Sequence, residues 1–169
     1  INAQTSSEVS DVIDKIIAYE SDTERKSWRN LITLVADDGY TSTSYEGALH
    51  TTPSEFLSNF RIPKYFELNK IYMAAYPDEL TSAGRRKPAV NKAILDAINN
   101  GTLILNYIGH GSPDLWAHEV VFDKNISIPQ IRNENYFFLT AATCDFGYYD
   151  IPNFQSATEA LLLLKNAGC

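Results

Sequence analysis

Two short apolar segments of this chain each end on a chemically reactive side chain. The first, residues 103–105, leads into residues 106–112, where His110 lies between two glycines. The second, residues 136–143, ends on Cys144. We interpret both segments as buried strands, and the carboxyl ends of parallel strands lie along one edge of a sheet. The sequence therefore predicts an imidazole and a thiol at the edge where open α/β sheets hold their ligands.

Strand and helix patterns alternate along the rest of the chain. A continuous apolar run over residues 31–36 ends in Asp37-Asp38-Gly39 and is typical of a strand buried on both faces. Apolar residues at helical spacing predict helices over residues 6–20, 53–60, 90–98 and 159–164, and a further strand is expected within residues 65–76. We expect the basic residues 81–87 to form a solvated loop. The alternation predicts an α/β fold, with helices on both faces of a mostly parallel sheet.

Composition limits the kind of protein. With 169 residues and 44% hydrophobic residues, the chain is long enough for one globular domain, residues 1–169. A net charge of −7 argues against non-specific nucleic-acid binding. No apolar run approaches the roughly 18–20 residues of a transmembrane helix. Because Ile1 is not an initiator Met and Cys169 follows a helix stop at residues 165–168, we expect a piece of a larger protein, truncated at both ends.

The residue types at the sheet edge suit nucleophilic catalysis. A cysteine attacks as its thiolate, and an imidazole can accept the thiol proton. The backbone N–H groups of Gly111 and Cys144 are candidates for an oxyanion hole. A third group commonly orients the imidazole. Asp38, at the end of the first strand, is our candidate for that role.

Other interpretations of the same residues are open. Cys144 is also compatible with a small core residue, Trp116 with a core anchor and Glu119 with a solvated charge. A zinc site of His110, His118 and Cys144 is disfavoured, because the histidine spacing fits no helical pair and the chain lacks a Cys-x-x-Cys motif. A small-molecule-binding domain is disfavoured because no strand precedes a glycine-rich phosphate loop. We expect no metal and no cofactor, and two cysteines make no disulfide framework, although a single Cys144–Cys169 bridge stays open.

At these residues the chain resembles the gingipain family of cysteine peptidases, which share the caspase-like fold. The resemblance rests on residues 106–112, Trp116 and residues 142–144, and extends to residues 16–20 and 159–161. Residues 35–39, 116–119 and 142–146 are similar to the C-terminal signal peptidases, or sortases, of the type IX secretion system. The resemblance implies a three-layer αβα domain with a mostly parallel sheet.

The resemblance also implies roles for individual residues. Cys144 would be the nucleophile, His110 the general base and acid, and Asp38 the acidic third member. Trp116, Glu119 and Glu46 are the candidates for substrate binding. Glu46 is the acid nearest to the position from which arginine-specific gingipains grip arginine, so strict arginine specificity is not expected.

The implied function is that of a cysteine endopeptidase outside the cell. Its substrate would be a protein or peptide, namely the C-terminal signal domain of secreted cargo. Its partners would be type IX secretion components at the outer membrane, and its acyl-enzyme would pass to water or to a lipopolysaccharide amine. The alternative is a catalytically inactive binding or scaffold module with the caspase-like fold.

Overall fold

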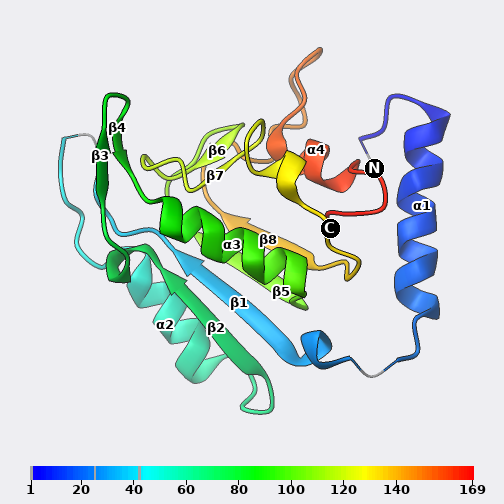
Figure 1. Cartoon of the computed structure of the whole chain (residues 1–169), viewed down its shortest axis with the longest axis horizontal. Helices are drawn as coiled ribbons and strands as arrows, with labels where there is room; N and C mark the ends of the chain where they lie inside the picture. The colour runs from blue at the N-terminus through cyan, green and yellow to red at the C-terminus, as the bar shows by residue number, and fades with distance from the viewer. Residues whose placement is uncertain (1, 25, 42) are drawn as a thin grey trace.

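The structure, a computed structural model, describes residues 2–24, 26–41 and 43–169. Its centre is a four-stranded parallel sheet in the order β2-β1-β5-β8 (Figure 1). The strands are β1 (Leu31–Ala36), β2 (Glu67–Tyr72), β5 (Ile104–Ile108) and β8 (Phe138–Ala142). Strands were predicted over residues 31–36, 103–105 and 136–143, and the structure has β1, β5 and β8 at these places. The expectation that the segment before Cys144 is a buried strand was wrong, because β8 lies at the edge of the sheet and is partly exposed. The parallel α/β fold predicted from the alternating pattern is confirmed.

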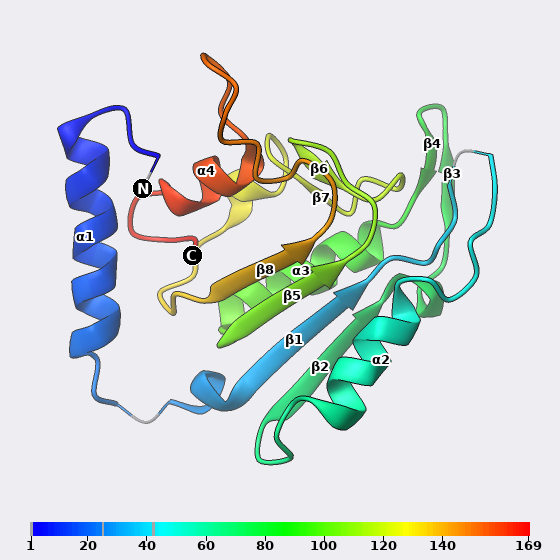
Figure 2. The same ribbon diagram turned by 180° about the vertical axis from the view of Figure 1, so that it is seen from behind.

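Helices cover both faces of this sheet. The helix α2 (Thr51–Phe60) lies on one face and α3 (Pro88–Asn100) on the other, as comparison of Figures 1 and 2 shows. The helix α4 (Ala157–Leu162) contributes Ala157 and Leu161 to the same apolar core as α3. The helix α1 (Ser6–Ser21) lies beside α4, and a groove of about 360 Å³ separates it from the start of β8. No helix in the described ranges is long and apolar enough to span a membrane.

Two small hairpins stand over the carboxyl edge of the sheet. One joins β3 (Glu79–Thr81) to β4 (Gly84–Arg86), and the other joins β6 (Leu115–Trp116) to β7 (Phe122–Asp123). The prediction of a solvated basic loop over residues 81–87 was wrong. Arg85 is half-buried and Lys87 is only 3% exposed at its side chain, because both form ion pairs with acidic side chains near β1.

The core explains why the sequence adopts this arrangement. The apolar stripe of α3, including Val90, Ile94 and Ile98, is fully buried against the sheet. An aromatic group fills the space between the sheet, the β6–β7 hairpin and α4. Its centre is Trp116, which stacks on Tyr107 with ring centroids 4.3 Å apart. This group fixes the segment that follows β5.

Strand register places the two reactive residues at the same height. Ile108 of β5 is paired with Ala142 of β8, and also with Ala36 of β1. His110 and Cys144 each lie two residues beyond this paired level. This register brings both side chains to one edge of the sheet, as the sequence predicted.

Gly109 is required by close packing beneath His110. A Cβ atom at this position would overlap the ring of Tyr107 and Cβ of Asp37, and both of those residues are buried. Neither neighbour can move without disturbing the sheet edge. We therefore expect Gly109→Ala to lower the free energy of unfolding by about 1–3 kcal/mol.

Urea denaturation of Gly109→Ala and of Gly147→Ala tests this expectation. At Gly147 an added Cβ would lie 3.1 Å from the ring of Tyr149, which is 59% exposed and free to move. The Gly147 substitution should change stability by less than about 0.5 kcal/mol. Equal midpoints for the two variants would contradict the packing argument.

Candidate active site

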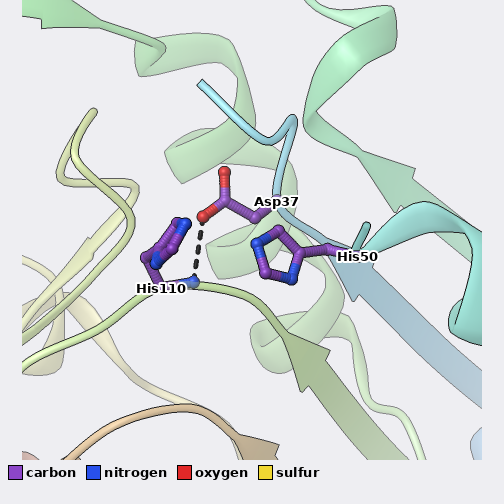
Figure 3. A group of neighbouring side chains, drawn as sticks. All are labelled: Asp37, His50 and His110. Atoms are coloured by element: carbon purple, nitrogen blue, oxygen red, sulfur yellow. Dashed lines mark hydrogen bonds between the residues drawn. The ribbon is translucent and has the colours of Figure 1, made fainter. Parts of the chain in front are cut away.

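The backbone of His110 is held on both sides by buried groups. Its N–H donates to Oδ2 of Asp37 over 3.0 Å (Figure 3). Its carbonyl accepts from the Tyr107 hydroxyl over 2.6 Å and from the Ala117 N–H over 2.8 Å. Asp37 is 1% exposed, and its other oxygen accepts from the Asp38 N–H. These bonds fix the direction in which the imidazole leaves the chain.

The imidazole of His110 is surrounded by a carboxylate and two further histidines. Nε2 of His110 lies 2.8 Å from Oε2 of Glu46. The ring centroids of His50 and His118 lie 4.9 Å and 5.2 Å from that of His110. Burial lowers the pKa of His50, which favours its neutral form. Glu46 is thus the carboxylate in position to orient the imidazole of His110.

Asp38 lies in a separate, buried ion-pair cluster. Its Oδ2 lies 3.2 Å from Nη1 of Arg85 and 3.4 Å from Nζ of Lys87, and its side chain is 1% exposed. The Arg85 guanidinium also pairs with Glu119. Asp38 occupies the expected edge of the sheet, but its carboxylate is committed to these cations and not to His110. This differs from the expectation that Asp38 orients the imidazole.

Cys144 is an exposed, free thiol two residues after the end of β8. The next residue, Asp145, has φ of 55°, so the chain turns sharply away from the sheet there. No hydrogen bond joins the thiol to His110 within the described ranges. Cys169 is also a free thiol, and burial raises its pKa to about 11. Of the two cysteines, Cys144 is therefore the accessible one.

Gly111 joins the two strand ends. A Cβ on Gly111 would overlap Oγ1 of Thr143, the residue before Cys144. Glycine is thus required for the chain after β5 to approach the chain after β8. In the part of the chain that the structure describes, neither the Gly111 nor the Cys144 N–H donates to another protein group. Both remain available to a substrate oxygen.

Trp116 and Glu119 are both buried beside the site. Trp116 is 1% exposed and stacks between Tyr107 and the rings of Phe122 and Phe146. Glu119 is also 1% exposed, and burial raises its pKa to about 7. Neither side chain has a surface to offer a substrate in this structure. Trp116 is thus a core anchor, which was one of the two interpretations left open by the sequence. Glu119 is buried and is therefore not the solvated charge that was the alternative for it.

Sequence reasoning gave no role to Asp37 or His50. From the sequence, Asp37 was treated only as one half of the acidic pair with Asp38. Side chains alternate between the two faces of a strand, so Asp37, directly after Ala36, should point to the opposite face from Asp38, and this alternation could have separated their roles. His50 lies in the turn before α2 and has no pattern around it. Only the folded chain brings it to His110.

Comparison with known proteins identifies the family and the fold. The model of peptidase family C25 matches residues 1–169. The chain belongs to peptidase family C25. Solved structures similar to this chain include the Arg-specific cysteine proteinase gingipain R (RgpB), with a TM-score of 0.71 and 21% identity over 98% of this chain and 36% of that one. No curated protein matches the chain.

Two further structures have the same fold. The complex of the Porphyromonas gingivalis RgpB pro- and mature domains gives a TM-score of 0.66 at 21% identity, over 98% of this chain and 37% of that one. A structure described as a protease gives 0.65 at 17% identity, over 98% and 33%. The chain thus spans about a third of the length of these structures. They show that this C25 chain has the gingipain fold.

We expect Glu46→Gln to lower kcat/KM for peptide cleavage by at least about tenfold, because a neutral amide holds an imidazolium less well than a carboxylate does. The effect should fall mainly on kcat. The matched control is Glu55→Gln, because Glu55 on α2 has a carboxylate of similar exposure that pairs with Lys70 of β2 and not with His110. Steady-state kinetics of both variants test this, and equal rates would remove Glu46 from the site.

Proposed function

We propose that the chain is the catalytic part of a cysteine endopeptidase, with Cys144 as nucleophile and His110 as general base and acid. The observation that supports this most directly is the common register of β5 and β8. It carries an exposed thiol and a partly exposed imidazole to the same level of one sheet edge. The family match over the whole chain supports the same reaction class.

The reaction follows from the positions of these groups. His110 takes the proton of the Cys144 thiol, and the thiolate attacks the carbonyl carbon of the scissile peptide bond. The developing oxyanion accepts hydrogen bonds from the N–H groups of Gly111 and Cys144. The C–N bond then breaks, His110 gives its proton to the leaving amine, and a thioester remains on Cys144. A water molecule, activated by His110, hydrolyses that thioester.

In this proposal Glu46 replaces Asp38 as the group that orients His110. The 2.8 Å contact to Nε2 supports this assignment. With Glu46 bound to the imidazole, it is not free to grip a substrate arginine. Asp38 and Glu119 are buried and already paired with Arg85. We therefore propose a specificity other than the arginine specificity named for gingipain R.

The finer proposal is a PorU-like role, as the C-terminal signal peptidase or sortase of type IX secretion. It rests on the sequence resemblance of residues 35–39, 116–119 and 142–146. The cargo C-terminal domain would be the substrate, and the location would be the cell surface at the outer membrane. Water and an amine compete for the same thioester, so the acceptor decides between hydrolysis and transpeptidation.

Product analysis by mass spectrometry tests both levels of the proposal. The protein is incubated with peptides that span a cargo cleavage site, with and without an added amine acceptor. Cleavage that requires Cys144 supports the endopeptidase, and an amide-linked acceptor on the new carboxyl end supports the sortase role. Hydrolysis alone would leave the endopeptidase and reject the sortase. Absence of any cleavage together with retained peptide binding would favour the scaffold module.

A further inference from the structure

Three metal-ligand side chains meet beside the proposed general base. Asp37, His50 and His110 each place one ligand atom within 4.8 Å of the others (Figure 3). The three residues come from different parts of the fold: the end of β1, the turn before α2 and the segment after β5. Figure 3 shows the two imidazoles and the carboxylate converging on one volume. We propose that this group binds a zinc ion, and that the bound ion inhibits the peptidase.

The distances are compatible with zinc after small side-chain rotations. Zn–N and Zn–O bonds of about 2.0–2.2 Å in a tetrahedron place the ligand atoms roughly 3.4 Å apart. Nε2 of His50 is buried and has no hydrogen-bond partner in the described part of the chain. Oε2 of Glu46 lies 2.8 Å from Nε2 of His110 and 3.9 Å from Nε2 of His50. Glu46 can therefore supply a fourth ligand, or leave that position to water.

The donor types favour zinc over calcium or magnesium. Two imidazoles and one carboxylate suit zinc, whereas the alkaline-earth ions prefer oxygen ligands alone. The neighbouring acidic group of Asp37, Asp38 and Glu119 differs in this respect. The guanidinium of Arg85 already pairs with two of the three carboxylates, Asp38 and Glu119, so a cation of the protein itself already balances their charge.

The functional consequence rests on the proposed peptidase mechanism. A zinc ion bound to one imidazole nitrogen of His110 leaves the ring proton on the other nitrogen, so the ring can no longer accept the Cys144 proton. Inhibition of this kind forms no covalent bond to the enzyme's substrate, and removal of the zinc ion restores His110 as the general base. The ion would act as a reversible inhibitor and not as a cofactor.

Zinc titration against a chromophoric chelator tests the site directly. The variants are His50→Gln, which removes one ligand, and the matched control His118→Gln, whose ring lies 5.2 Å from His110 but outside the ligand group. We expect one zinc per chain in the unmodified protein. His50→Gln should weaken binding by more than the roughly 10–100-fold caused by loss of a mere supporting residue, and His118→Gln should not. Circular dichroism checks that both variants fold.

Two further measurements separate the possible failures. Cys144→Ala distinguishes this site from one that uses the thiolate, and His50→Cys, which keeps a metal ligand, should show a cobalt–thiolate absorption band. Unchanged affinity in His50→Gln, or loss of binding in Cys144→Ala, would overturn the site. Zinc should inhibit peptide cleavage in the unmodified protein and much less in His50→Gln. If cleavage is absent altogether, the peptidase proposal fails, while the titration still decides the metal site.

Discussion

Cys144→Ala should lower kcat/KM for peptide cleavage by at least about 1,000-fold. Removal of the nucleophile from a nucleophile–base pair removes the covalent pathway, and the residual rate then comes from binding and the oxyanion hole. Because the thiol is exposed and makes no hydrogen bond in the described ranges, stability should change by less than about 0.5 kcal/mol. The loss would therefore be chemical and not a consequence of unfolding.

Kinetics and thermal unfolding of the same samples test this expectation. Cys169→Ala serves as the control thiol, because Cys169 packs against the core. Its replacement should affect stability more than activity. A Cys144→Ala protein that cleaves at a tenth of the normal rate or faster would exclude Cys144 as the nucleophile.

Arg85→Ala should lower the free energy of unfolding by about 3–5 kcal/mol. The guanidinium pairs with Asp38 and Glu119, whose side chains are each 1% exposed. Removal of one partner of a buried ion pair leaves the opposite charge without compensation. Among the described residues, Lys87 would remain as the cation paired with Asp38.

The loss should grow with pH. Burial already raises the pKa of Glu119 to about 7, and Arg85 lowers it, so removal of Arg85 raises it further. Between the ordinary carboxyl pKa and this raised value the folded state binds more protons than the unfolded state, so stability falls as pH rises. Urea denaturation at pH 5 and pH 8 should show the larger loss at pH 8.

Lys70→Ala is the matched control for Arg85→Ala. Its pair with Glu55 lies at the surface, with both side chains more than a third exposed. Such pairs contribute about 0–1 kcal/mol. Equal losses in the two variants, or a loss for Arg85→Ala that is greater at pH 5, would contradict the account of a buried charge cluster.

β1 was the most predictable strand, because burial on both faces leaves a continuous apolar run, whereas β8 is a partly exposed edge strand. β1 coincides with the apolar run over residues 31–36, and α3 follows the apolar stripe that ends before Gly101. The positions of His110 and Cys144 followed from the ends of two such runs. Each strand end could be predicted from the residues next to it in the sequence. Strand pairing then places the two ends at one edge of the sheet.

The partners of these side chains were not predictable in the same way. Asp38 and Glu46 are both acids near His110, and the choice between them depends on Arg85, which a hairpin over 40 residues away in sequence delivers to Asp38. That hairpin was predicted as a solvated loop, since its basic residues gave no indication of buried acids to pair with. His50 reaches His110 only through the fold of the chain before α2. Long-range charge pairing thus decides the details of the site.

pH-dependent alkylation shows whether His110 and Cys144 act as a pair. Iodoacetamide labelling of each cysteine is followed by mass spectrometry, in the unmodified protein and in His110→Ala, with Cys169 as the internal control. Our account predicts that Cys144 labels at a much lower pH than Cys169, whose pKa is raised to about 11, and that His110→Ala moves Cys144 labelling to higher pH. Labelling of Cys144 that is unchanged by His110→Ala would show that the thiol and the imidazole do not interact, and would contradict the account.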